Sequence, residues 1–227
     1  MSAPRALVVC AALAAGVAGV AAQSPNQYEV FLAMGLKPKS VLTGTVVRGD
    51  VFPDPGEEVV AVATWMTGAK DKAQAVAVRF AILTEDGSRV RVLHKIDYGD
   101  RYPGGVGRGE IELLDVDGDG LREILVTFDD YGDRLIERRR GELLHWTGGA
   151  LTAGWEGEVA HDSTREAREV PPERRDRFVR TINYGETLRT RGVTLYFDKK
   201  VYAVAGETLA EPKVVLEPFP LKAPPVR

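Results

Sequence analysis

The sequence predicts an all-β protein built from antiparallel repeat units, and three observations support this fold class. Short runs of β-branched and aromatic residues, such as 124–128, are bounded by turn-forming Asp and Gly residues. An Asp-Gly pair within 80–93 marks a hairpin between two such runs. An acidic stretch at 115–123 and a weaker copy at 50–58 are offset by 65 residues, which indicates an internal repeat.

The first 22 residues predict a signal peptide. Arg5 provides a positive start, 6–20 is apolar and rich in small residues, and 20–22 forms a suitable cleavage site. The alternative, a single membrane anchor, requires about 20 apolar residues, more than this run contains. We therefore expect a secreted or periplasmic protein with no stable membrane insertion after signal cleavage. The only cysteine, Cys10, lies in this segment, so we expect no disulfide in the mature chain. A bound metal ion would then be the remaining obvious crosslink that stabilises the fold.

The charge balance argues against nucleic-acid binding. The chain has 30 Lys and Arg against 33 Asp and Glu, a net charge of −3. A basic cluster at 138–140 lies between Glu137 and Glu142, which is typical of a solvated edge strand or turn.

The sequence divides into a lead segment, a β-repeat domain and a tail. Segment 23–40 is expected to hold one short helix around 28–34, and 218–227 is a Pro-rich tail. Each repeat unit is expected to contain an acidic loop, a strand and a hairpin. The third unit is the weakest, because it lacks the acidic loop, and its turn is placed at 198–200. The β-repeat domain spans 41–217, with units at about 48–99, 113–159 and 178–216.

The acidic stretch 115–123 has the composition of a calcium-binding loop that connects two strands. Calcium takes six to eight oxygen ligands, and alternate carboxylates on a tightly curled segment supply them with little chain. Gly120 at position 6 would allow the sharp turn that such a loop needs. The candidate ligands at positions 1, 3, 5, 7 and 9 are Asp115, Asp117, Asp119, the backbone carbonyl of Leu121, and Glu123.

The flanks of this loop distinguish it from an EF-hand. An EF-hand places a bidentate Glu at position 12, where this chain has Val126, and its loop is flanked by helices instead of strand-type runs. The pattern of an Asp-rich loop with a closing acid before an apolar strand resembles the FG-GAP/VCBS repeats of integrin-like β-propellers. This resemblance implies stacked four-stranded units of β-propeller type and a role as an extracellular adhesion or ligand-binding module. The alternative is an acidic hairpin turn without a metal.

The copy at 50–58 keeps acids at positions 1, 5 and 9, namely Asp50, Asp54 and Glu58. Phe52 replaces the middle aspartate, and two prolines stiffen the loop, so we expect a structural relic or a weak second calcium site. Units spaced by 65 residues give about three per chain, whereas propellers close with about four to eight blades. Closure of the propeller is therefore open, with a partial propeller or an irregular β-sandwich as alternatives.

Three Tyr-Gly pairs, at Tyr98, Tyr131 and Tyr184, each lie between acidic or amide residues and predict turns in which Gly takes a positive φ. One interpretation packs each ring on a sheet. The other exposes a rim of tyrosines for stacking on a ligand.

The residues that could carry catalysis are few. His94 and His145 are expected in strands, and no pair of histidines has zinc-ligand spacing. His161, Asp162 and Ser163 have the residue types of a catalytic triad, but neighbours in the chain do not readily converge as one.

We therefore expect an exported, non-catalytic calcium-binding β-repeat protein whose partner is an unknown protein or glycan. One alternative is a secreted inhibitor or carbohydrate-binding protein that presents the Gly-rich segment 98–108. A less favoured alternative is a glycan hydrolase that uses loop carboxylates.

Overall fold

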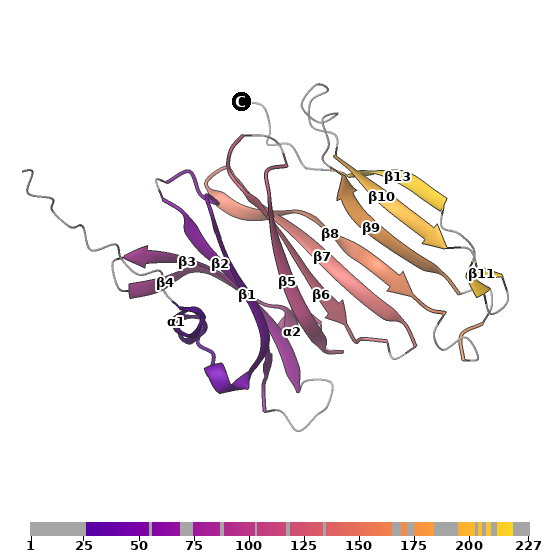
Figure 1. Ribbon diagram of the computed structural model, residues 1–227, viewed down its shortest axis with the longest axis horizontal. Coiled ribbons are helices and arrows are strands. Elements are labelled where there is room, and N and C mark those ends of the chain that lie inside the picture. Colours follow the sequence, from indigo (N-terminus) through magenta and orange to yellow (C-terminus); the bar gives the residue numbers. More distant parts are fainter. Residues whose placement is uncertain are drawn as a thin grey trace, which may run out of the picture.

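The computed structural model is an all-β protein of antiparallel sheets, as predicted (Figure 1). The structure describes residues 26–54, 56–68, 75–86, 89–102, 104–116, 119–133, 135–164, 169–171, 175–183, 195–202, 204–205, 208–209 and 213–219. The predicted signal peptide and residues 220–227 of the predicted Pro-rich tail lie outside these ranges, whereas the first two residues of that tail, 218 and 219, belong to the last strand. No helix within the described ranges is long and apolar enough to cross a membrane.

The strands form a four-stranded sheet, a seven-stranded sheet and a small two-stranded ribbon. The smaller sheet is a meander in the order β1-β2-β3-β4, and the larger has the order β13-β10-β9-β8-β7-β6-β5. The smaller sheet contains β1 (Val41–Gly49), β2 (Glu58–Met66), β3 (Val76–Asp86) and β4 (Arg89–Asp97). The larger contains β5 (Val106–Leu114), β6 (Glu123–Asp130), β7 (Glu137–Thr147), β8 (Ala150–Asp162), β9 (Arg177–Asn183), β10 (Leu195–Tyr202) and β13 (Lys213–Phe219). The ribbon pairs β11 (Val204–Ala205) with β12 (Thr208–Leu209), and the helices are α1 (Gln27–Ala33), the 3-10 turn η1 (Pro38–Ser40) and α2 (Tyr98–Arg101).

The internal repeat predicted from the acidic loops recurs in the strand arrangement. β1 and β5 begin 65 residues apart, as do β2 and β6, and in both pairs the acidic loop joins the two strands. The hairpins β3–β4 and β7–β8 follow with an offset of 61, because the connection before β7 is shorter than that before β3. Each of these two units is thus four antiparallel strands, and it includes the strand before its acidic loop.

The two four-stranded units pack face to face through β5, which lies against β1, β2 and β3. Val62 and Phe80 of the smaller sheet meet Val126 and Phe128 of the larger one in a fully buried core. Gly109 permits the close approach, since a Cβ there would lie 2.6 Å from a methyl group of Val78. This core fixes the position of the acidic loops at its margin.

Helix α1 covers the other face of the smaller sheet. Val30, Phe31 and Met34 pack on the alanines and branched side chains of β2 and β3. Asn26 and Glu29 form a reciprocal capping box at the start of the helix, which fixes where it begins. The helix expected around 28–34 is therefore confirmed.

Two local predictions are wrong. The expected turn at 198–200 is the middle of β10, which pairs continuously with both β9 and β13. The cluster 138–140 lies in β7, an interior strand paired with β6 and β8, so it is not an edge strand or a turn. Its charges are tolerated there because Asp129 and Asp130 on β6 pair with them.

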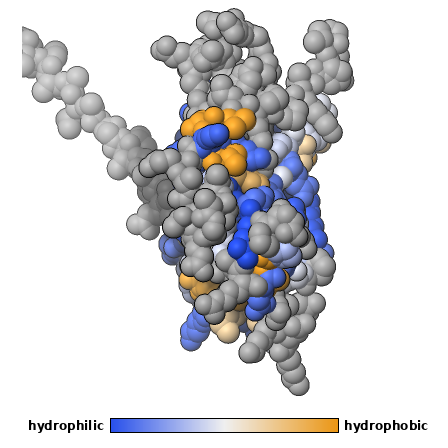
Figure 2. All heavy atoms as spheres, turned by 90° about the vertical axis from the view of Figure 1, so that its right-hand side faces the viewer, coloured by the Kyte–Doolittle hydropathy of each residue, from blue (hydrophilic) through white to orange (hydrophobic). Residues whose placement is uncertain are grey.

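The described strands form open sheets, with β13 and β5 at the edges of the larger one, and no closed propeller is present in them. Figure 1 shows β9, β10 and β13 extending the larger sheet on the side away from α1. Figure 2 views the molecule from that side and shows apolar patches among hydrophilic ones, and the edge strand β13 exposes Val214 and Val215.

Candidate functional site

The two acidic loops lie side by side at one margin of the core. The backbone N–H of Arg122 donates to the carbonyl of Asp50 at 2.6 Å, which links the second loop to the first. Gly49 allows this contact, since a Cβ there would lie 2.7 Å from Leu113 Cδ1. The structure therefore brings together two segments that the sequence related only by their similarity.

Each loop is closed by its last acid through a buried hydrogen bond to the backbone seven residues earlier. Glu58 Oε2 accepts from Val51 N at 2.8 Å, and Glu123 Oε2 accepts from Val116 N at 2.6 Å. Both carboxylates are buried, with residue exposures of 6% and 4%. The sequence identified both glutamates as candidate metal ligands and missed this backbone role.

The turn of the second loop has the geometry that its glycine predicts. Gly120 has a φ of 94°, so position 6 does adopt the left-handed region. Leu121 N donates to Asp119 Oδ1 at 2.8 Å, which fixes the aspartate at position 5 over the turn.

Asp115, the first candidate ligand, has a carboxylate oxygen without a partner. Its Oδ1 is buried and accepts no hydrogen bond in the part of the chain that the structure describes. A buried unsatisfied polar oxygen costs about 1–3 kcal/mol, so such an atom calls for an explanation. Asp117, the candidate ligand at position 3, lies outside the described residues.

The three acids of the first loop differ in their exposure. Asp50 and Asp54 are exposed to solvent, whereas Glu58 is buried beneath the loop. Across the described ranges, no group of three or more His, Cys, Asp or Glu side chains is placed to hold a metal ion.

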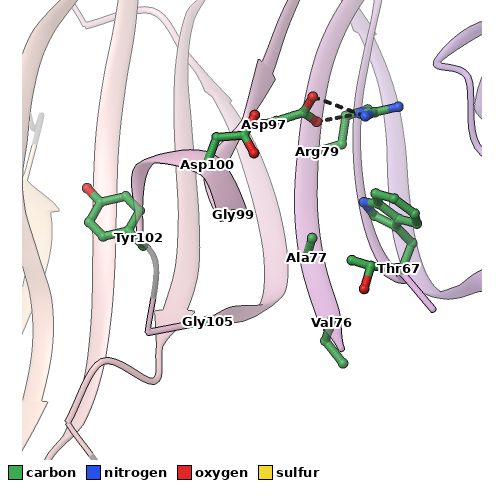
Figure 3. Close-up of a pocket in the computed structure, with 10 residues that line it drawn as sticks. Thr67, Val76, Ala77, Arg79, Asp97, Gly99, Asp100, Tyr102 and Gly105 are labelled. Carbon is green, nitrogen blue, oxygen red and sulfur yellow. Dashed lines mark hydrogen bonds and ion pairs between the residues drawn. The ribbon is translucent and has the colours of Figure 1, made fainter. Parts of the chain in front are cut away.

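A pocket of about 430 Å³ lies where β2, β3 and α2 meet (Figure 3). Arg79 donates to both carboxylate oxygens of Asp97, at 2.5 and 3.0 Å, and its guanidinium lies 5.4 Å from the centre of the Trp65 ring. Asp100 and Tyr102 complete the lining from the α2 side, the start of the Gly-rich segment. The pocket thus combines aromatic walls with a pre-arranged ion pair.

Glu142 is a buried carboxylate that the sequence did not single out as a site. It accepts from Tyr98 Oη at 2.6 Å and from Arg101 at 3.0 Å. Burial, with the charge and hydrogen bond of Glu142, raises the pKa of Tyr98 well above its ordinary value. Glu142 lies in a run that contains Arg and Glu side chains, so only the three-dimensional contacts identify it as part of the core.

Of the tyrosines in the three Tyr-Gly pairs, Tyr98 is buried and Tyr131 is exposed. Tyr98 is 1% exposed and packs in the core, whereas Tyr131 is 54% exposed. The expected positive φ is found at neither Gly99 nor Gly132. Tyr184 lies outside the described residues.

The triad-type residues near the end of β8 do not form a serine nucleophile. Ser163 is fully buried and bonds Asp176 Oδ1 at 3.1 Å, and His161 Nε2 lies 3.0 Å from the same oxygen. The aspartate therefore stands between the serine and the histidine, whereas a triad needs the histidine to bond the serine directly. His94 and His145 lie in β4 and β7, as expected.

Comparison with protein-family models, curated proteins and solved structures finds no match to this chain. The resemblance to FG-GAP/VCBS repeats therefore depends on the loop residues themselves.

Proposed function

We propose that this protein is an exported, non-catalytic β-repeat module in which the 115–123 loop binds one calcium ion. The observation that supports it most strongly is the unpartnered, buried Oδ1 of Asp115. Calcium takes carboxylate oxygens as ligands at about 2.3–2.6 Å, so a buried oxygen that accepts no hydrogen bond within the protein is available to the ion. A water-inaccessible carboxylate oxygen at position 1 of an acidic loop fits that description.

The remaining residues of the loop are compatible with the ion. A carboxylate has about four lone-pair directions, so Asp119 and Glu123 can each accept their backbone hydrogen bond and still offer an oxygen to calcium. The backbone carbonyl of Leu121 and the Asp117 carboxylate would complete the set. Calcium supplies charge neutralisation here, since acids at alternate positions repel one another without a cation.

The ion would act structurally. The loop touches the first unit through the bond from Arg122 N to the Asp50 carbonyl, so ordering it stiffens the joint between the two units. In the first loop, Glu58 bonds both Val51 N and Phe52 N, at 2.8 and 3.3 Å, so these backbone bonds close that segment.

A second candidate function, on the same scaffold, is that of a secreted inhibitor or carbohydrate-binding protein. The pocket in Figure 3 favours it, since Gly99, Asp100, Tyr102 and Gly105 come from the segment expected to be presented to a partner. In either case the partner is a protein or a glycan, and the net charge of −3 argues against nucleic acid.

Thermal unfolding with calcium and with chelator tests the calcium proposal. A site with a dissociation constant of about 10⁻⁴–10⁻³ M, typical of extracellular modules, stabilises the fold by about 1.4–2.7 kcal/mol at 10 mM calcium. This corresponds to a rise in Tm of about 3–10 °C for a chain of this size. Asp115→Asn should abolish the rise, and Asp50→Asn, at the same position of the first loop, should retain it. Equal Tm values in calcium and chelator would contradict the proposal.

A further inference from the structure

A second pocket, of about 650 Å³, lies over β5 to β9 of the larger sheet. Asp129 pairs with Arg139 in the β6–β7 register, and Arg139 pairs with Ala160 in the β7–β8 register. Paired residues share a face of a sheet, and successive residues alternate between faces. Most of the lining therefore projects from the face opposite to Phe128, away from the core between the two sheets. We call this the outer face.

Tyr131 is an exposed aromatic side chain at the edge of this pocket, and its backbone is firmly held. Its N–H donates to the Gly105 carbonyl at 2.9 Å. The next residue, Gly132, approaches Gly104 so closely that a Cβ on Gly104 would lie 2.2 Å from its Cα. Gly107 lies against the ring, where an added Cβ would be 2.5 Å from Tyr131 Oη. The ring thus packs against Gly107, while 54% of the residue remains exposed. Tyr131 is therefore a fixed aromatic side chain on which a ligand can stack.

Arg108, beside this ring, adopts a strained backbone conformation. Its φ of 45° is the one positive value among the described residues other than glycine, and it lies at the irregularity in the β5–β6 register between Gly107 and Glu110. Bulges of this kind redirect a side chain, and strained residues cluster at functional sites. The Arg108 side chain is 68% exposed and lies 3.2 Å from Glu110.

Asp129 and Arg139, which both line the pocket, form an ion pair that is held by further contacts. Arg139 lies between two carboxylates, at 3.2 Å from Asp129 and 2.5 Å from Glu110, and also donates to Thr127 Oγ1 at 2.9 Å. Burial raises the pKa of Asp129 even though Arg139 and Arg108 oppose the shift. These planar groups hold one another in place and retain unused lone pairs and N–H groups toward the pocket.

We propose that this outer-face pocket binds a saccharide, with the apolar face of one sugar ring on Tyr131 and its hydroxyl groups on Asp129 and Arg108. A sugar combines a flat C–H face with hydroxyls that both donate and accept, which matches a fixed aromatic beside alternating carboxylates and guanidinium groups. A simple anion fits less well because the arginines already face carboxylates, and an apolar ligand would leave these charges without water. This proposal rests on the binding role proposed above and is independent of the calcium loop.

A panel of soluble neutral, amino and uronic-acid oligosaccharides tests the proposal, with the best member then titrated by calorimetry. Tyr131→Ala should weaken binding at least about tenfold, a loss of about 1.4 kcal/mol. Tyr131→Phe, which retains the ring, should bind within about threefold of the parent, or about 0.6 kcal/mol. Tyr28→Ala is the matched control, because Tyr28 on α1 is 57% exposed but lies far from this pocket in the fold, and it should bind like the parent.

The outcomes separate this proposal from the calcium proposal. Absence of binding by every panel member at millimolar concentration would overturn the saccharide site, as would binding that Tyr131→Ala leaves unchanged. Asp115→Asn, measured in parallel, reports on calcium through Tm. If the Tm of the parent protein does not respond to calcium while Tyr131-dependent binding is intact, only the calcium proposal is contradicted. If calcium raises the Tm of the parent but not of Asp115→Asn, and no saccharide binds through Tyr131, only the saccharide site is contradicted.

Discussion

The closing glutamate of the first loop offers the sharpest test of how the acidic loops are built. Glu58 Oε2 accepts Val51 N at 2.8 Å and Phe52 N at 3.3 Å, and the residue is 6% exposed. Glu58→Ala removes the acceptor and leaves a buried N–H without a partner. A hydrogen bond to a charged group contributes about 1.5–3 kcal/mol, and an orphaned buried donor costs about 1–3 kcal/mol. Because these contributions overlap, we expect a loss of about 3 kcal/mol.

The assay is urea unfolding followed by circular dichroism, with Tm as a second readout. A loss of about 3 kcal/mol corresponds to a Tm lower by about 6–12 °C. Glu58→Gln, which retains a neutral acceptor, should lose about 1 kcal/mol, since a neutral bond is roughly half as strong. Glu57→Ala is the matched control, because that side chain is exposed and should change stability by less than about 0.5 kcal/mol. If Glu58→Ala is no more destabilising than Glu57→Ala, the account of loop closure is wrong.

Two further predictions concern the packing and the charges of the core. Gly109→Ala should lower the free energy of unfolding in urea by about 1–3 kcal/mol, because the added Cβ would lie 2.6–2.7 Å from two valines of the facing sheet. Gly99→Ala is the control: its Cβ would lie 3.3 Å from its nearest neighbour, so the change in stability should be close to zero. Burial lowers the pKa of His94 although the Glu142 charge opposes it, so its NMR titration midpoint should lie below the usual value of about 6.5. The unfolded chain then binds this proton more readily, so stability should fall as pH decreases through about 6.5, and His94→Gln should reduce that slope. A midpoint above 6.5, or a neutral Gly109→Ala, would contradict these accounts.

The repeat could be predicted from the sequence because its acidic loops and hairpin turns depend on local chemistry. In the 115–123 loop, the alternating Asp and Gly residues predict a tight turn, and the positive φ of Gly120 agrees with that prediction. The strands between the loops are short β-branched runs, so their type was also predictable.

The errors arise where a residue's role depends on a partner distant in the sequence. The arginines 138–140 look solvated in the sequence, but all three form ion pairs with aspartates of β6 within the larger sheet. Segment 198–200 has the composition of a turn, yet strands on both sides supply its ladder partners.

The closing acids show the same limitation. An acid at position 9 of such a loop can bind a metal or accept a hydrogen bond from a backbone N–H. The sequence does not show the hydrogen bond, whereas the structure shows that Glu58 and Glu123 each accept one from the residue seven positions earlier. Tyr98 and Tyr131 likewise have the same local sequence, but one is buried and the other exposed.

Direct measurement of calcium binding tests the central claim most directly. Isothermal titration of the metal-free protein should give one calcium per chain with a dissociation constant of about 10⁻⁴–10⁻³ M, and Asp115→Asn should abolish the signal. Asp50→Asn should leave both the stoichiometry and the affinity unchanged, because Asp50 is exposed to solvent and Glu58 already accepts two backbone hydrogen bonds. A protein that binds no calcium, or whose binding survives Asp115→Asn, would contradict the assignment of the 115–123 loop.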